Sequence, residues 1–296
     1  MSTALVNARV LTPEGFKADR AVLVKDGRVE DLVPASDPRL KAAERHDLAG
    51  RTLLPGFIDC QVNGGGGALF NATPSVDGIR TIALAHRRFG TTGLLPTVIS
   101  DSPEVMRAAV AAVDAALATV PGVLGIHIEG PYLAPARKGV HAEATLRRPE
   151  AAESAWLAGA LKRGKCLVTL APEQVPPGFI RALASSGVIV AIGHTDGDYL
   201  SMRRALADGA RGFTHLYNAM SPLKSREPGA VGAALEDPAS WCGIIVDGHH
   251  VHPASLRVAL TAKPRGKLFL VTDAMPTVGA ADPSFLLNGE AIVERD

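Results

Sequence analysis

Cysteines, aromatic residues and long apolar segments are all scarce in this 296-residue sequence. Its three cysteines, Cys60, Cys166 and Cys242, lie far apart and form no CxxC pair, which excludes a dense disulfide framework and favours a reducing compartment. No apolar run approaches the ~20 residues that a membrane-spanning helix needs. The opening residues, MSTALVNARVLTPEGF, also lack the charged start and apolar core of a signal peptide.

An excess of charge of either sign is missing too. The 31 basic and 30 acidic residues are interspersed and leave a net charge of +1. Because no basic face is expected, neither a nucleic acid nor a membrane is predicted as a partner. These absences together predict a cytoplasmic protein that acts on small molecules.

The first 52 residues differ in pattern from the rest of the chain. The segments ALVNARVLT and RAVLVKDGRVEDLVP alternate as short strands do, and Asp26-Gly27 supplies a two-residue turn. We therefore expect residues 1–52 to form part of a small β-sandwich domain.

From residue 53 to residue 280, short apolar runs alternate with helical patterns. Eight runs stand out: TLLPGFIDCQV, TTGLLPTVI, VLGIHIEG, KCLVTLAPE, VIVAIGHT, GFTHLYN, WCGIIVDGHH and KLFLVTDAM. Nearly continuous apolar runs are typical of parallel strands that are buried on both faces. Between them, Ser102 is predicted to cap a helix that has Pro103 at its first position, and Asp198 lies near the start of a second helical pattern. The fold class is therefore α/β, a (β/α)8 TIM-type barrel.

After the eighth run the sequence continues only with ADPSFLLNGEAIVERD. No helical pattern is present there, so we expect the barrel to lack its last helix. Residues 281–296 are interpreted as the start of a hairpin insertion in a chain that stops early.

Polar side chains gather where the predicted strands end, and in a barrel these ends meet at one rim. They are Asp59, Gln61, Asn63, Glu129, His194, His215, Asp247, His249, His250 and Asp273. A single histidine at a strand end is usually structural, but several independent strands share the feature here. Glu129, His194 and His215 have the composition of a catalytic zinc site with one open position. Asp273 is placed to act as a base for metal-activated water.

Seven segments in the same order resemble the motifs of the N-acetylglucosamine-6-phosphate deacetylase family, in the amidohydrolase superfamily. They are FIDCQVNGGGG, GIHIEGPYLAPARKGVH, TLAPE, IGHT, THLYNAMSPL, IIVDGHHVHP and LVTDAM, between Thr52 and Met275. The resemblance implies hydrolysis of the acetamide of N-acetylglucosamine 6-phosphate to glucosamine 6-phosphate and acetate. It also implies that Glu129, His194 and His215 bind the metal and that Asp273 activates water and then protonates the leaving amine.

The resemblance further implies that His141 polarises the acetamide carbonyl and that Arg226 binds the phosphate. His250 would reach the phosphate in a neighbouring subunit, which implies a homodimer. The substrate-binding set that it implies is Val140, His141, Asn218, Ala219, Arg226, Asp247, Gly248, His249, His250, Gln61 and Asn63.

The number of metal ions follows from a departure from the superfamily pattern. Many amidohydrolases carry His-x-His at the end of the first strand, where this chain has Gln61-Val62-Asn63. Neutral amides are poor replacements for imidazole, so one divalent metal per subunit is expected. Zinc fits the ligands, and iron, cobalt or manganese are compatible with them.

Two other functions stay open at this point. The chain resembles amidohydrolases broadly enough to act on another N-acyl sugar or on a cyclic amide. The early stop is also compatible with an inactive, truncated sugar-binding relic.

Overall fold

The computed structural model describes residues 2–294 and divides into two compact units, one ending at Gly56 and the other beginning at Phe57. In the N-terminal unit, a four-stranded sheet has the order β5-β4-β1-β6 and a three-stranded sheet the order β3-β2-β7. The strands are β1 (Thr3–Val6), β2 (Arg9–Thr12), β3 (Gly15–Lys17), β4 (Arg20–Lys25), β5 (Arg28–Pro34), β6 (Glu44–Asp47) and β7 (Thr52–Leu53). A 3-10 helix spans Pro38–Lys41.

The predicted turn between β4 and β5 is confirmed. Asp26 and Gly27 both have positive φ, 50° and 74°, while Lys25 pairs with Arg28 across the hairpin. A two-residue hairpin turn with positive φ at both positions favours residues such as aspartate followed by glycine. The assignment of residues 1–52 to a β-sandwich and of residues 281–296 to an insertion stays a prediction.

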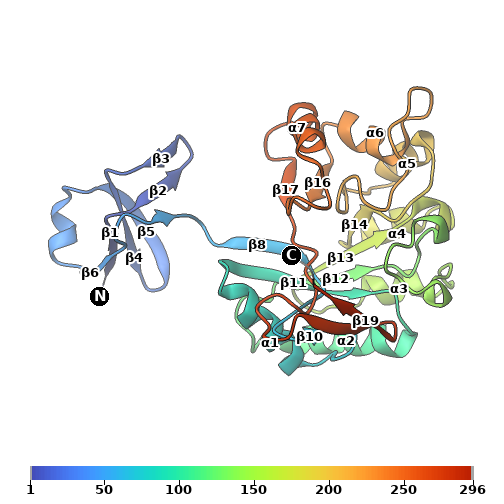
Figure 1. Ribbon diagram of the computed structural model, residues 1–296, viewed down its shortest axis with the longest axis horizontal. Helices are drawn as coiled ribbons and strands as arrows, with labels where there is room; N and C mark the ends of the chain where they lie inside the picture. The colour runs from blue at the N-terminus through green and yellow to red at the C-terminus, as the bar shows by residue number, and fades with distance from the viewer. Residues whose placement is uncertain (1, 295–296) are drawn as a thin grey trace. The chain divides into compact units, whose positions relative to one another are not determined.

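The C-terminal unit contains an eight-stranded parallel sheet in the order β17-β16-β15-β14-β13-β12-β11-β8 (Figure 1). Its strands are β8 (Phe57–Val62), β11 (Thr91–Ile99), β12 (Gly125–Glu129), β13 (Lys165–Leu170), β14 (Ile189–Ile192), β15 (Gly212–Phe213), β16 (Trp241–Ile244) and β17 (Leu268–Leu270). A parallel bridge between Val62 and Ala274 brings the first strand to the segment after the last. The predicted TIM-type barrel is confirmed.

Helices lie outside this sheet and cover its strands (Figure 1). They are α1 (Val76–Arg87), α2 (Pro103–Ala116), α3 (Glu153–Ala158), α4 (Phe179–Ser185), α5 (Tyr199–Ala207), α6 (Gly229–Glu236) and α7 (Pro253–Ala262), with 3-10 helices at Pro135–Arg137, Glu143–Thr145 and Pro172–Gln174. The predicted N-cap is confirmed, since the side chain of Ser102 accepts a hydrogen bond from Val105 N. Asp198, near the start of α5, caps that helix in the same way by accepting from Ser201 N. No helix among the described residues is long and apolar enough to cross a bilayer.

The core of the C-terminal unit lies between the strands and the helices. In β12, Ile126 and Ile128 are fully buried and belong to the same apolar cluster as Ala109 and Val113 of α2. Alternate residues of a strand point to opposite faces, so His127 and Glu129 face the barrel interior. The strand thus packs its apolar face outward and delivers polar side chains inward.

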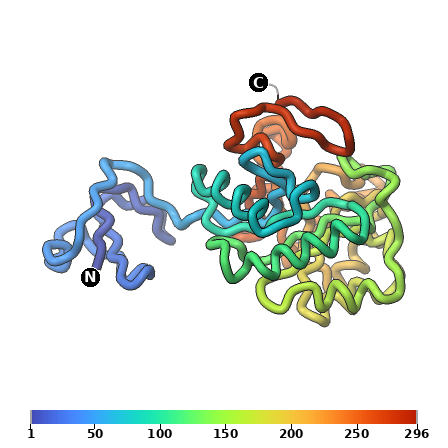
Figure 2. Tube along the Cα trace, turned by 90° about the horizontal axis from the view of Figure 1, so that it is seen from below, coloured from blue at the N-terminus to red at the C-terminus, as the bar shows by residue number. Residues whose placement is uncertain are grey.

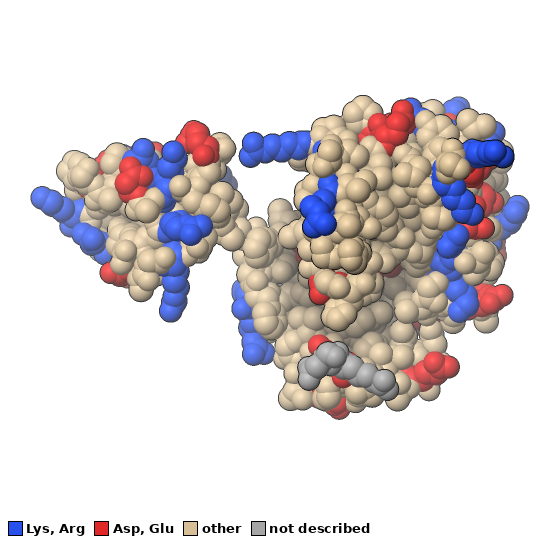
Figure 3. All heavy atoms as spheres, turned by 45° about the horizontal axis from the view of Figure 1, so that its top comes forward, with Lys and Arg blue, Asp and Glu red and all other residues tan. Residues whose placement is uncertain are grey.

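Two hairpins lie near the carboxyl ends of the strands. One pairs β9 (Gly64–Gly65) with β10 (Ala68–Leu69), and the other pairs β18 (Ser284–Leu287) with β19 (Glu290–Val293). The second hairpin, red in Figure 2, packs Leu287 against Leu69 and Ile99. On the face of the C-terminal unit shown in Figure 3, the cationic and anionic side chains lie mostly towards the margins.

Helix α1 offers a test of this packing. Ile82 is fully buried, whereas Leu84 is 55% exposed on the same helix. We expect Ile82→Ala to lower the free energy of unfolding by about 2–5 kcal/mol, because it leaves a cavity in the core. Leu84→Ala serves as the control and should change it by about 0.5 kcal/mol or less. Urea denaturation followed by circular dichroism measures both, and equal losses would contradict the placement of α1.

Candidate metal centre and active site

Three buried side chains from three strand ends converge at the carboxyl rim of the barrel. Glu129 is the last residue of β12, while His194 and His215 each lie two residues beyond β14 and β15. The distance from Glu129 Oε1 is 3.2 Å to His194 Nε2 and 3.1 Å to His215 Nε2. The two Nε2 atoms are 3.0 Å apart. The structure therefore brings the three predicted metal ligands together.

This triangle fits a divalent metal ion. Zinc–ligand bonds of 2.0–2.2 Å in tetrahedral geometry place neighbouring ligand atoms roughly 3.3 Å apart. His194 Nδ1 donates to the main-chain oxygen of Arg137 at 2.8 Å, so the lone pair of its Nε2 is directed at the triangle. His215 Nδ1 is buried without a hydrogen-bond partner among residues 2–294. One carboxylate and two imidazoles are also a donor set that zinc prefers.

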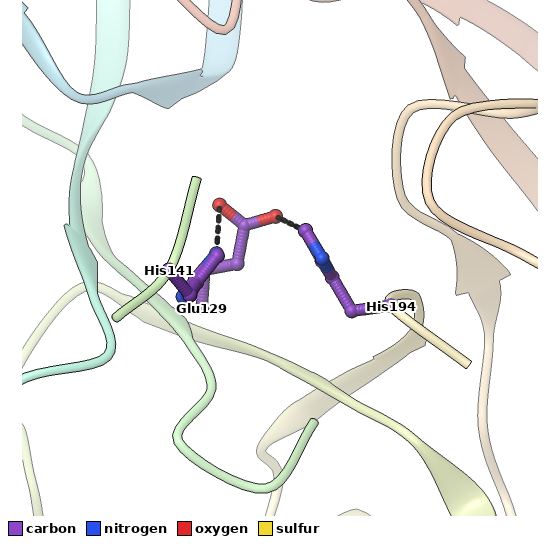
Figure 4. A group of neighbouring side chains, drawn as sticks. All are labelled: Glu129, His141 and His194. Atoms are coloured by element: carbon purple, nitrogen blue, oxygen red, sulfur yellow. Dashed lines mark hydrogen bonds and ion pairs between the residues drawn. The ribbon is translucent and has the colours of Figure 1, made fainter. Parts of the chain in front are cut away.

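His141 belongs to the same cluster but has a different role in hydrogen bonding. Figure 4 shows the imidazoles of His141 and His194 directed at the two oxygens of Glu129, and the His141 Nε2 to Glu129 Oε2 distance is 4.0 Å. The main-chain N–H of Ser100 donates to His141 Nδ1 at 3.3 Å, and Ser100 Oγ lies 2.8 Å from the same atom. Because Nδ1 accepts, Nε2 carries the ring proton in the neutral imidazole. His141 is thus built to donate a hydrogen bond into the site.

The electrostatics of the cluster favour a cation at its centre. Burial raises the pKa of Glu129, but hydrogen bonds and charge from His194 and His215 outweigh it and hold that pKa well below the usual value. Burial lowers the pKa of His215, yet Glu129 raises it to about 9 overall. Burial, with the charge of His194, lowers the pKa of His141 to about 3. His141 is therefore neutral near pH 7, and positive charge collects beside Glu129.

Two amides and a second carboxylate adjoin this cluster. Gln61 Nε2 donates to Glu129 Oε1 at 3.1 Å, and Asn63 Nδ2 donates to Asp273 Oδ1 at 2.7 Å. Burial, followed by the negative charge of Glu129, raises the pKa of Asp273. A raised pKa suits a carboxylate that must first take a proton and then release it.

Backbone strain is concentrated in the same place. Five residues without the freedom of glycine have positive φ around the site: His194, His215, Tyr217, Ala219 and Asp273, with φ of 48°, 30°, 80°, 48° and 52°. Each such conformation costs about 1–3 kcal/mol and persists only where surrounding contacts enforce it. These strained backbone conformations therefore set the directions in which the side chains around the site point.

The other predicted site residues lie in loops around the rim. Asn218 and Ala219 lie three and four residues after His215, and Asn218 Nδ2 donates to His215 O at 3.3 Å. Val140 is half exposed, and its oxygen accepts from Asn288 Nδ2 at 2.8 Å. Arg226 is exposed in a turn that a hydrogen bond from Lys224 N to Glu227 O closes.

The loop of residues 247–250 is ordered by one carboxylate. Asp247 Oδ1 accepts from the main-chain N–H groups of His249 and His250, and Asp247 Oδ2 lies 2.6 Å from His250 Nδ1. Gly248 adopts a φ of 86° in the middle of this turn. Among the described residues, neither this loop nor Arg226 forms a hydrogen bond or ion pair with Glu129, His194 or His215.

Sequence reasoning missed two partners of the site. Ser100 fixes the tautomer of His141, and it directly follows β11, so the strand-end signal that selected the other residues could have found it. The main-chain oxygen of Arg137 orients His194, and no side-chain pattern marks such a contact.

A parallel barrel whose rim holds a buried carboxylate and imidazoles defines the class of metal-dependent barrel hydrolases. The chain belongs to the amidohydrolase family, because residues 52–277 match the sequence profile of that family.

Individual relatives and solved structures agree with this membership. The chain is 46% identical to an N-acetylgalactosamine-6-phosphate deacetylase of Shewanella sp. (strain ANA-3), over 97% of this chain and 73% of that protein. It is 41% identical to the human N-acetylglucosamine-6-phosphate deacetylase, over 98% of this chain and 73% of that protein. The N-acetylglucosamine-6-phosphate deacetylase of Pasteurella multocida superposes with a TM-score of 0.93 at 35% identity, covering 100% of this chain and 78% of that one.

The assignment of the metal ligands can be tested by metal analysis of purified variants. We expect about one divalent ion per chain in the unaltered protein, and a sharp fall in His194→Ala and His215→Ala. His141→Ala is the matched control and should keep the ion, because its Nε2 carries a proton. Loss of the ion in His141→Ala, with retention in His215→Ala, would reverse the assignment of these two histidines.

Proposed function

We propose that this chain hydrolyses the acetamide of N-acetylglucosamine 6-phosphate to glucosamine 6-phosphate and acetate, in a metal-dependent reaction. The observation that carries the proposal is the 3.0–3.2 Å triangle of Glu129 Oε1, His194 Nε2 and His215 Nε2 at the barrel rim. The names of the human and Pasteurella multocida relatives support the choice of substrate.

The proposed cofactor is one divalent ion per subunit, zinc in the first place, with iron, cobalt or manganese as alternatives. Glu129, His194 and His215 would hold it. When bound, such an ion polarises a carbonyl oxygen and lowers the pKa of bound water towards about 7.

The remaining chemistry is assigned to two side chains. Asp273 accepts a proton from the attacking water as the new C–O bond forms at the acetyl carbon. The same proton then passes to the amine nitrogen as the C–N bond breaks, which releases acetate and the free amino sugar. His141 donates its Nε2–H to the acetamide oxygen, and its low pKa of about 3 keeps this imidazole neutral.

Substrate binding is assigned to the loops around the rim. Gln61, Asn63, Val140, Asn218 and Ala219 are proposed to contact the sugar. The phosphate is assigned to Arg226, whose guanidinium suits bidentate binding of phosphate oxygens.

The remaining phosphate contacts are assigned to Asp247, Gly248, His249 and His250. His250 would act in the neighbouring subunit of a homodimer; its exposed side chain, which Asp247 orients, supports that assignment. The scarcity of cysteine supports a cytoplasmic location.

N-acetylgalactosamine 6-phosphate is a second candidate substrate, and a specific finding favours it. The Shewanella relative named for that substrate is 46% identical to this chain, against 41% for the human relative named for the glucosamine compound. The two sugars differ only in the configuration at C4, so the same metal centre serves either.

Acetate release from four compounds tests the substrate: the two 6-phosphates and their unphosphorylated parent sugars. We expect kcat/KM to be at least about 100-fold higher for a 6-phosphate than for its parent sugar, because charged hydrogen bonds to phosphate contribute several kcal/mol. Arg226→Ala should remove most of that preference through KM, while Arg265→Ala, an exposed control, should not. Equal rates on phosphorylated and unphosphorylated sugar would reject a phosphate-binding site.

The role of Asp273 is tested by Asp273→Asn, which keeps the shape and hydrogen bonding of the side chain but cannot take a proton. We expect kcat to fall by about 100-fold or more while the metal content stays at that of the unaltered protein. Asp77→Asn, at a 96% exposed side chain of α1, is the control for an aspartate-to-asparagine change. Full activity of the Asp273 variant would show that another group moves the proton.

A further inference from the structure

The first and last strands of the barrel are not joined by a ladder of main-chain hydrogen bonds. β8 and β17 are the two ends of the eight-stranded sheet, and the bridge between Val62 and Ala274 is isolated. A cavity of about 560 Å³ lies along this seam and is lined by Ile58, Asp59, Leu270 and Thr272, among others. Asp273 is the next residue in the chain after Thr272. Because β8 and β17 are not paired here, the position of Asp273 depends on contacts other than a regular strand pairing.

One buried carboxylate supplies those contacts from the side of β8. Asp59 is 4% exposed, and its Oδ2 accepts from Thr272 Oγ1 at 2.6 Å and from Thr272 N at 3.2 Å. Its Oδ1 accepts from Gln61 N at 3.1 Å. A carboxylate that accepts from both the main chain and the side chain of one residue fixes that residue's orientation, and hydrogen bonds to an ionised group are stronger than neutral ones.

The Thr272 hydroxyl connects this carboxylate to the far side of Asp273. Thr272 Oγ1 donates to Asp59 and accepts from Ala274 N at 3.3 Å, so it spans the main chain of the residue between them. Asp273 N donates to Gln61 O at 3.0 Å on the same seam. Asp273 has a φ of 52°, a conformation that an aspartate holds only where its neighbours enforce it.

We propose that Asp59 and Thr272 are positioning residues, which hold the backbone of Asp273 in its left-handed conformation and so aim its carboxylate into the active site. The inference rests on the proposed function, because it gives these two residues a role in the proton transfer assigned to Asp273. Neither residue forms a hydrogen bond or ion pair with Glu129, His194 or His215 among the described residues. Thr272 is therefore expected to act on the base and not on the binding of metal, whereas Asp59 also holds the main chain of Gln61, whose side chain donates to Glu129.

Threonine-to-valine substitution tests this proposal without a change of shape. Thr272→Val keeps the side-chain volume but removes the hydroxyl, whereas Thr272→Ser keeps the hydroxyl. We expect kcat of Thr272→Val to fall by about 10- to 100-fold, the loss typical of a misaligned catalytic group. KM should change by less than about threefold, and the metal content should not change. Thr272→Ser should retain most of kcat.

A matched control lies in the N-terminal unit. Thr12 Oγ1 donates to Gly15 O at 2.8 Å and accepts from Glu14 N at 3.2 Å, so it spans one residue as Thr272 does. Thr12→Val removes an equivalent pair of hydrogen bonds outside the barrel and should leave kcat unchanged.

Asp59→Asn provides a second variant that does not depend on Thr272, because it places an N–H or a weaker acceptor against the donors of Thr272 and Gln61. It should lower kcat in the same way, and the double variant should lose no more than about the larger single loss, since the two residues act as one unit.

The crystal structure of Thr272→Val gives a readout that is independent of activity. We expect φ of Asp273 to leave the left-handed region and the 2.7 Å hydrogen bond from Asn63 Nδ2 to Asp273 Oδ1 to be lost. An unchanged kcat in Thr272→Val, an equal loss in Thr272→Ser, or an Asp273 that keeps its conformation would each overturn the proposal. A protein without deacetylase activity in any form would instead reject the proposed function, and the crystal structure would still decide the positioning role.

Discussion

Glu129 is a carboxylate that is 2% exposed at the end of a strand whose other residues are buried as well. An ionised group in that setting is costly unless positive charge lies beside it. Its two oxygens face the imidazoles of three histidines from separate parts of the chain. The need to compensate this one buried charge explains why the nitrogen atoms converge on it and why the pKa of His215 is raised. It also explains why the cluster suits a divalent cation.

The cluster also explains the arrangement of the residues around it. His194 and His141 each use one ring nitrogen as a hydrogen-bond donor, and main-chain groups decide which one: the oxygen of Arg137 for the first and the N–H of Ser100 for the second. Two histidines with the same side chain are thereby suited to different chemistry, one to binding a metal ion and the other to donating a hydrogen bond. The difference lies in the loops and strand ends that hold them.

The convergence of the residues at the strand ends was predictable from the sequence, because in a parallel barrel the carboxyl ends of all strands meet at one rim. Glu129, His194, His215 and Asp273 follow from that rule once the apolar runs are recognised as strands. The tautomer of His141 and the pairing of Asp59 with Thr272 do not, because they depend on which main-chain groups face each other across strands. Periodicity carries no information on such contacts, and the positive φ of Asp273 arises from them.

The contact between Asn63 and Asp273 joins residues 210 positions apart in the sequence. Closing so long a loop costs conformational entropy. The residues of the rim that face one another are therefore brought together only by the folded barrel and not by local structure. A cation that recognises the finished rim but not the unfolded chain adds its binding free energy to the native state alone. Binding of such an ion would therefore stabilise the folded form independently of any turnover.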